Sequence, residues 1–258
     1  MDATTNALPV VGVSNMAAAS DLAVYGAAIA AAYAASYGVA KRFMPNAPCF
    51  AVAGDAIFGL VYYPLLVVLA FDACCDLHVD ARQRWMGTTV SSATLGKLLT
   101  SRMIVHMPYL LLKESPEEVA RRPGYMVHHC IVVVAYGAGV FRSLAHFWGA
   151  AAALCEATNI FLTVDEALMS WPKVYAELVV PRQCLQLGFQ ATYVVFRLAL
   201  FPAILCVMCA DARSMAAADF ARLGVFELLV FPASLSFVLA LSVSWAAEAF
   251  RAPRPKAA

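Results

Sequence analysis

The chain has 258 residues, of which 62% are apolar and only 14% are charged, and its formal net charge is +1. Soluble domains contain roughly 45–50% apolar and about 25% charged residues, so the composition excludes an ordinary soluble globule. The near-neutral charge also excludes the basic field that nucleic-acid binding requires. The sequence therefore predicts an all-α, polytopic membrane protein.

A window of about 20 apolar residues, the length that crosses a bilayer as a helix, predicts about seven transmembrane helices. In chain order they cover 18–40, 48–71, 90–112, 125–142, 144–164, 184–210 and 223–248. We expect one transmembrane domain over 18–248, with short tails at 1–17 and 249–258. No Lys or Arg precedes the first segment, so it lacks the charged start of a signal peptide and is expected to stay in the mature protein.

The third segment, 90–112, carries Lys97, Arg102 and His106 among its apolar residues. It has two readings, a spanning helix and an amphipathic helix lying in the membrane interface. We favour spanning because Trp85 before it and Tyr109 near its end are typical interfacial anchors. Polar linkers are expected at 41–48, 72–84, 113–124 and 165–182.

The distribution of Lys and Arg predicts the orientation, because cytosolic loops are enriched in these residues. One set of alternate loops carries ten of them and the other carries five, which places the N-terminus outside and the C-terminus in the cytosol. The cytosolic set is Lys41, Arg42, Lys113, Arg121, Arg122, Lys173, Arg182, Arg251, Arg254 and Lys256; the other is Arg82, Arg84, Arg142, Arg213 and Arg222. Lys97, Arg102 and Arg197 lie within spans and are the first functional candidates, because charge inside a membrane is costly.

Segments 125–142 and 144–164 form a predicted helical hairpin that turns near Arg142. His128 and His129 lie about fifteen residues before this turn, and Thr158 and Asn159 lie about fifteen after it. At 1.5 Å per residue the two groups share one depth, with Glu156 slightly nearer the turn. His106 falls at a comparable level in the preceding span.

Neighbouring histidines point about 100° apart on a helix, so His128 and His129 do not face one ligand as an i, i+4 pair would. This argues against a simple zinc site, and no metal is expected. The alternatives that stay open are a metal site built from His106, one histidine of the pair and Glu156, and a purely interfacial location of the histidines.

Three stretches resemble the TLC-domain family, which includes the ceramide synthases and smaller TLC-domain-containing proteins. They are Met126-Val127-His128-His129, Glu156-Ala157-Thr158-Asn159-Ile160-Phe161-Leu162, and Phe196-Arg197 with Pro202 downstream. The resemblance covers about 45–245 and is sharpest over 125–202. Cys155 replaces the histidine of the ceramide-synthase pattern, and Thr163 replaces an asparagine of the smaller members, to which the chain is more similar.

The resemblance implies a barrel of membrane helices and acyl transfer from acyl-CoA to a lipid amine or hydroxyl, with no cofactor. The implied catalytic residues are His128 and His129, as general base or nucleophile, and Glu156, which orients the ring or accepts a proton. Arg102 or Arg197 would bind phosphate or a developing oxyanion. The expected substrate-binding set is Arg102, His106, Thr158, Asn159 and Arg197.

Each role has a structural alternative. Glu156 and Arg197 form a buried pair that fixes packing in one alternative, Thr158 and Asn159 bond between helices in another, and the Arg102 and His106 face lines water or headgroups in a third. Asp55 is either a packing residue or a cavity residue.

Two functional classes remain open: a lipid acyltransferase of the endoplasmic reticulum or another secretory-pathway membrane, and a non-enzymatic protein that binds, organises or traffics membrane lipids or cargo. A transporter is weaker because the sequence contains no inverted repeat. The expected partners are membrane lipids and acyl-CoA, without nucleic acid, and the sequence does not determine an oligomeric state.

Overall fold

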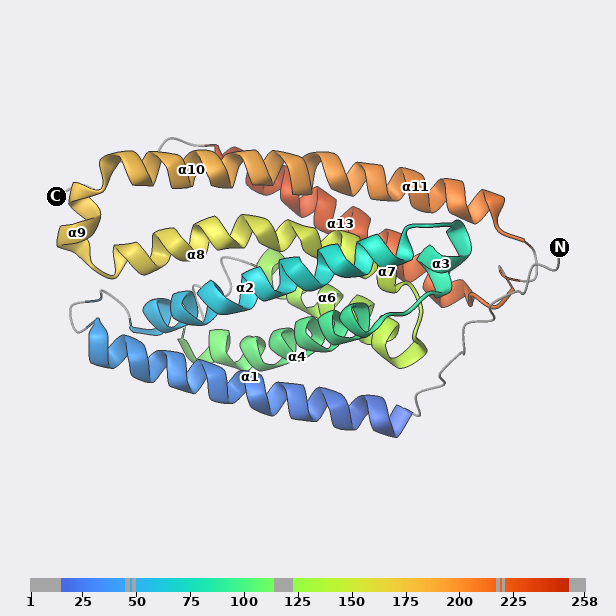
Figure 1. Cartoon of the computed structure of the whole chain (residues 1–258), viewed down its shortest axis with the longest axis horizontal. Helices are drawn as coiled ribbons and strands as arrows, with labels where there is room; N and C mark the ends of the chain where they lie inside the picture. The colour runs from blue at the N-terminus through green and yellow to red at the C-terminus, as the bar shows by residue number, and fades with distance from the viewer. Residues whose placement is uncertain are drawn as a thin grey trace.

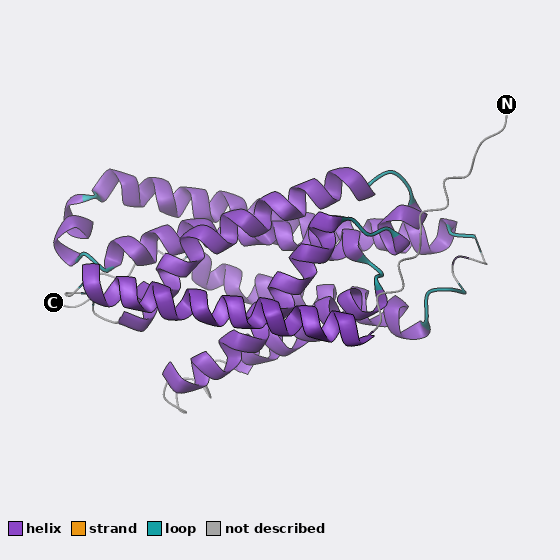
Figure 2. Cartoon of the chain, turned by 60° about the horizontal axis from the view of Figure 1, so that its bottom comes forward, coloured by secondary structure: helices purple, strands orange, loops and turns teal. Residues whose placement is uncertain are grey.

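The computed structural model describes residues 15–44, 47, 50–113, 123–216, 219 and 221–250. Within these residues the chain is helical and contains no strand (Figure 2). The elements are α1 (Asn15–Phe43), α2 (Phe50–Leu77), α3 (Ala81–Met86), α4 (Val90–Lys113), α6 (Pro123–Arg142), α7 (His146–Ala153), the 3₁₀ turn η1 (Leu154–Glu156), α8 (Ala157–Met169), α9 (Pro172–Glu177), α10 (Val179–Tyr193), the π-helical segment η2 (Val194–Ala199), α11 (Leu200–Ser214) and α13 (Val225–Ala249).

The long helices of the described chain form seven units that run back and forth along one axis (Figure 1). Two of these units are composite, since η1 joins α7 to α8 and η2 joins α10 to α11. Five units, namely α1, α2, α7 to α8, α10 to α11 and α13, are long and apolar enough to cross a membrane, and α6 is a shorter apolar helix. The predicted helical membrane bundle is therefore confirmed.

The remaining long helix, α4, is less apolar than the other units but packs along α1, α2 and α6 inside the bundle. Its charged side chains find partners there, because Lys97 Nζ lies 2.5 Å from Asp21 Oδ2 of α1. Arg102 is buried as well. The position of α4 favours a spanning helix over an interfacial one, and its neighbours explain why its own hydropathy is modest.

Several predicted linkers are instead helical. Helix α2 continues through Asp72 to Leu77, and most of 165–182 belongs to α8, α9 and α10. The polar residues there are satisfied without breaking the helix: the Ser91 hydroxyl donates to Asp72, and the Tyr175 hydroxyl donates to Asp165 at 3.1 Å. The predictions treated polarity as a break, whereas these polar residues lie within helices. The centre of the predicted 113–124 linker lies outside the described residues.

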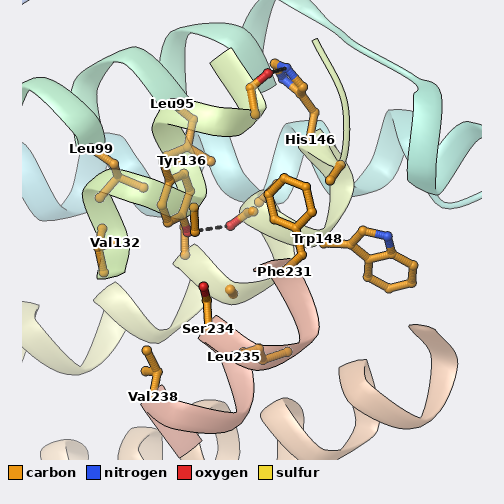
Figure 3. Close-up of a pocket in the computed structure, with 18 of the residues that line it drawn as sticks. Leu95, Leu99, Val132, Tyr136, His146, Trp148, Phe231, Ser234, Leu235 and Val238 are labelled. Carbon is orange, nitrogen blue, oxygen red and sulfur yellow. Dashed lines mark hydrogen bonds between the residues drawn. The ribbon is translucent and has the colours of Figure 1, made fainter. Parts of the chain in front are cut away.

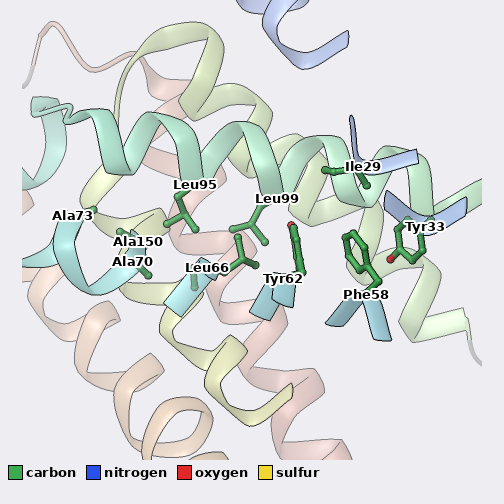
Figure 4. Packing of buried hydrophobic residues seen from close by; sticks show 11 residues of the cluster. Ile29, Tyr33, Phe58, Tyr62, Leu66, Ala70, Ala73, Leu95, Leu99 and Ala150 are labelled. Carbon is green, nitrogen blue, oxygen red and sulfur yellow. The ribbon is translucent and has the colours of Figure 1, made fainter. Parts of the chain in front are cut away.

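The first hydrophobic core joins α1, α2, α4 and α7 (Figure 4). Its centre is an aromatic stack in which the Tyr33 and Phe58 ring centroids are 4.1 Å apart and those of Phe58 and Tyr62 are 4.9 Å apart. A second core joins α3, α7, α11 and α13, where the rings of Trp85 and Trp148 meet edge to face at 5.6 Å.

One end of the bundle is fastened by Arg84 of α3 and Asp211 of α11. Arg84 donates from Nε and Nη2 to the two carboxylate oxygens at 2.6 Å, and from Nη1 to the His78 carbonyl at 2.7 Å. These hydrogen bonds to Asp211 raise the pKa of Arg84. The fork-shaped pair fixes the short helix α3 against α11.

Candidate functional site

Two of the predicted histidines meet between α4 and α6. His106 Nδ1 and His129 Nε2 are 3.1 Å apart, and each residue is only 1% exposed. His106 lies seven residues before the end of α4 and His129 six residues after the start of α6, so antiparallel packing brings them to one level. The expected depth of His106 is therefore confirmed.

Asp55 of α2 continues this contact into a chain of three polar groups. Its Oδ2 atom lies 3.8 Å from His106 Nε2, an electrostatic contact longer than a hydrogen bond. The ring of Tyr33 from α1 stacks on His106, with centroids 6.0 Å apart and planes 7° apart. Asp55, which the sequence left between packing and cavity, thus belongs to the surroundings of the histidines.

His128 points in a different direction from its neighbour, as the helical geometry predicts. The two rings lie edge to face at 89°, with centroids 5.7 Å apart, and His128 also faces the Trp245 ring of α13. Its Nδ1 atom is buried and has no hydrogen-bond partner within the described chain. Of the adjacent pair, His128 is the one whose side chain lines a cavity.

The cavity lies between α4, α6, α7 and α13 and has a volume of about 100 Å³ (Figure 3). This is several times the ~10–15 Å³ that one water molecule requires. Its walls are mainly apolar, with Val132, Leu235 and Val238 among the residues drawn. His128 and Glu156 both contribute polar side chains to it.

Two other polar groups of the cavity are already satisfied by the protein. The Tyr136 hydroxyl donates to the Gly149 carbonyl at 2.7 Å. His146 lies 3.1 Å from Ser92 Oγ and 3.2 Å from the Gly139 carbonyl through its two ring nitrogens. His128, Glu156 and Ser234 are among the other polar residues whose side chains line the cavity and are placed to meet a bound molecule.

Glu156 is the last residue of the 3₁₀ turn η1, which interrupts the predicted continuous helix 144–164. Asn159 donates from Nδ2 to Glu156 Oε2 at 2.6 Å, and Thr158 donates to the Cys155 carbonyl at 2.7 Å. Both bonds are local, and among the described residues neither side chain forms the hydrogen bond between helices that one alternative gave it. Asn159 holds the Glu156 carboxylate in place.

Arg197 lies in the π-helical segment η2, which packs against η1. Its guanidinium carbon is 5.6 Å from the centroid of the Tyr193 ring, and its buried Nε atom has no hydrogen-bond partner among the described residues. Glu156 acts on it electrostatically, yet no Glu156–Arg197 ion pair within 4.0 Å occurs in the described structure. Glu156 and Arg197 each lie in a segment that departs from α-helical geometry, a 3₁₀ turn and a π-helix respectively. Such segments often occur at functional sites.

Arg102 faces α2 rather than lipid headgroups. It donates from Nη2 to the Tyr63 hydroxyl at 2.8 Å, and its guanidinium carbon lies 5.4 Å and 5.3 Å from the ring centroids of Tyr62 and Tyr63. The sequence analysis missed both tyrosines, although two adjacent tyrosines in an otherwise apolar span are a detectable signal. These aromatic rings contribute to stabilising the buried cation.

No set of three His, Cys, Asp or Glu side chains in the described parts of the chain is arranged to hold a metal ion. His106 and His129 approach each other, whereas Glu156 does not join them in such a set.

A family model described as TLC domain matches residues 54–251. No curated protein and no solved structure matches the chain. The matched segment contains every predicted site residue, while α1, which supplies Tyr33, precedes it.

Proposed function

The chain belongs to the TLC-domain family, and on this premise we propose that it is a membrane-embedded acyltransferase that moves an acyl group from acyl-CoA to a lipid amine or hydroxyl. The observation that carries the proposal is His128, whose buried Nδ1 atom lacks a partner in the described chain and whose ring lines an apolar cavity together with Glu156. A neutral imidazole at an apolar cavity suits both general-base and nucleophilic catalysis.

In the general-base route, His128 accepts the proton of the lipid amine or hydroxyl as the nitrogen or oxygen attacks the thioester carbonyl. The C–S bond then breaks, and the imidazolium returns the proton to the departing CoA thiolate. In the nucleophilic route, the ring nitrogen attacks the thioester carbonyl, and the C–S bond breaks to release the CoA thiolate. The lipid nitrogen or oxygen then attacks the acyl-imidazole carbonyl, the C–N bond to the ring breaks, and the proton of the lipid passes to the CoA thiolate. Both routes balance without a metal or redox cofactor.

The remaining residues have supporting roles in this proposal. Glu156, held by Asn159, stabilises the imidazolium. His106 holds His129, the neighbour of His128 in α6, and Asp55 approaches the other side of the His106 ring. Arg197 and Arg102 stabilise anionic groups of the substrate or the developing oxyanion. Thr158, which is satisfied on its own helix, has no assigned contact with substrate.

We propose that acyl-CoA approaches from the cytosolic end of the bundle. Under the positive-inside rule this is the end where α1 finishes with Lys41 and Arg42. His106 and His129 lie nearer this end than the middle of their helices, which suits a water-soluble acyl donor. A secretory-pathway membrane such as the endoplasmic reticulum is the proposed compartment of this multi-pass protein.

The second candidate is a protein that binds and organises lipids without transforming them. The observation that favours it is the cavity wall, in which Tyr136 and His146 already bond to the protein and most other residues are apolar. Such a chamber accepts a hydrocarbon chain whether or not a reaction follows.

Release of CoA distinguishes the two candidates. Protein purified into nanodiscs with a mixed lipid extract is incubated with acyl-CoA, free CoA is measured, and the lipid product is identified by mass spectrometry. His128→Ala/His129→Ala is the test variant, and His78→Ala, at a histidine between α2 and α3, is the matched control. Loss of one general base removes about 10²–10⁴-fold in rate. Turnover in the double mutant equal to wild type would reject catalysis by these histidines.

A further inference from the structure

A second hollow lies outside the cavity, as a groove between α6 and α13. It is lined by apolar and small residues, including Cys130 and Val134 from α6 and Val230 and Ala233 from α13. Cys130 and Val134 are exposed, and both helices carry the apolar surface of membrane segments. The groove therefore faces the hydrocarbon of the bilayer.

Groove and cavity share two wall residues. Ile131 of α6 and Ser234 of α13 line both. These two side chains belong to the walls of both spaces, and Figure 3 places Ser234 on the α13 side of the cavity. Ile131 follows His128 by three residues and so projects from the same face of α6.

Side-chain contacts join α6 and α13 on both sides of Ile131 and Ser234 along the helix axes. At one end Arg142 of α6 forms an ion pair with Glu227 of α13, with Nη2 and Oε1 3.1 Å apart. At the other, His128 of α6 meets Trp245 of α13 edge to face. Ser234 lies seven residues, or about 10 Å, from Glu227 along α13. Between these contacts the two shared residues, Ile131 and Ser234, have aliphatic or small side chains, which move by rotamer changes alone.

We propose that a bilayer lipid enters the cavity sideways, with one acyl chain passing between α6 and α13 through the window formed by Ile131 and Ser234. The chain moves from one apolar environment into another, so the passage requires no transfer of hydrocarbon through water. The window opens one helical turn from His128, which brings the polar end of the chain to the cavity's histidine. The route rests on the proposed function only for what happens to the lipid afterwards.

Photocrosslinking in nanodiscs tests the route without requiring catalysis. The probe is phosphatidylcholine with a diazirine near the end of one acyl chain, and peptide mass spectrometry locates the adducts. We expect adducts in the groove at Val134 or Val230 and inside the cavity at Val132 or Val238. Absence of interior adducts in wild-type protein would overturn the proposal.

A variant with a bulky side chain at the window can be compared with a control variant elsewhere on α13. Ser234→Trp should reduce interior adducts about tenfold because the bulky ring overpacks the passage, while groove adducts persist. Ser244→Trp, at an exposed serine of the same helix, should leave both unchanged. Interior adducts that stay at wild-type level in Ser234→Trp would reject this route.

Alkylation of Cys130 gives a second test, in which the passage is blocked only after the protein has folded. A bulky, membrane-permeant maleimide applied to folded wild-type protein should lower interior adducts, whereas the same treatment of Cys130→Ser should not. Equal interior adducts in the two treated proteins would again reject the route. Interior adducts in a protein that never turns over acyl-CoA would support the route while rejecting the acyltransferase proposal, so the two failures are distinguishable.

Discussion

His106 of α4 and His129 of α6 are joined Nδ1 to Nε2 at 3.1 Å in a nearly water-free interior. One nitrogen donates and the other accepts, so the two rings hold complementary tautomers. Because Asp55 approaches the far nitrogen of His106, a proton on that nitrogen is favoured, which makes His129 Nε2 the donor to His106 Nδ1. The pair thus fixes both the packing of two helices and the protonation of two rings.

Removing one member of this pair should destabilise the bundle. His106→Ala leaves a buried nitrogen of His129 unsatisfied, which costs about 1–3 kcal/mol. Thermal unfolding in nanodiscs measures the change, and His78→Ala serves as the control. In a double-mutant cycle with His129→Ala, a coupling energy below about 0.5 kcal/mol would contradict the hydrogen bond.

The two adjacent histidines should differ in the property that their loss affects most, which is activity for His128 and stability for His129. His128→Ala should lower acyl-CoA turnover by about 10²–10⁴-fold, and its cost in stability should be limited to the ring contacts with Trp245 and His129, because its Nδ1 atom gives up no bond to the described chain. His129→Ala should lower thermal stability more, since it breaks the contact with His106. A His128 variant that unfolds earlier than the His129 variant would show that these roles are reversed.

The Arg84 and Asp211 pair should matter far more than a neighbouring exposed pair. Arg84→Gln leaves Asp211, whose side chain is 6% exposed, without its cation and should cost about 3 kcal/mol. Arg82→Gln, where the Arg82 side chain is 61% exposed and 3.6 Å from Asp219, should change stability by less than about 1 kcal/mol. Equal melting temperatures for the two variants would argue against the role of Arg84 in fastening the bundle.

The turn between α6 and α7 carries backbone strain that glycine should relieve. Ser143 has a φ of 51° and Ala145 a φ of 59°, in the left-handed region that side chains disfavour. Ser143→Gly should raise stability by about 1 kcal/mol, whereas Ser244→Gly inside α13 should lower it by about 0.5–1 kcal/mol. A lower melting temperature for Ser143→Gly would show that the serine side chain makes a compensating contact.

Cysteine accessibility in intact microsomes checks the orientation. Lys173→Cys in α9 should react with a membrane-impermeant maleimide applied from the cytosolic side, and Asp80→Cys before α3 should not. The two positions lie at opposite ends of the bundle (Figure 1). The reverse labelling pattern would invert the topology and place the histidines near the opposite membrane surface.

The helices of the fold could be predicted because membrane insertion imposes one length scale on the sequence, about 20 apolar residues per span. That rule failed where its physical basis is absent. The polar residues from Asp72 onward continue the helix instead of ending it, and Ala73 beside them still packs into the first core. Glu156 and Arg197 lie where the backbone departs from α-helical geometry, and a hydropathy window averages over such a change.

The sequence could predict the level of His106 along the helices, but not the direction in which the site side chains point. Counting residues along the spans placed His106 at a level comparable to that of the histidine pair, because the rise per residue is constant. Counting does not give helix rotation about its axis, which decides that His129 faces α4 while His128 faces the cavity. For the same reason the tyrosines around Arg102 were missed, since they come from another helix.

The π-helical segment Val194–Ala199 also lets the α10 to α11 helix hold one residue more than regular winding would. A π turn takes up one residue more than an α turn, so the residues after it keep the faces that they would have in a regular helix one residue shorter. Phe201, Ile204 and Met208 accordingly stay in the second core. Deleting one residue of the segment should therefore remove the bulge around Arg197 and leave the apolar pattern of α11 in place. An alignment of related chains should show single-residue gaps here without a shift in that pattern, so sequence comparison alone can reveal which relatives keep this geometry.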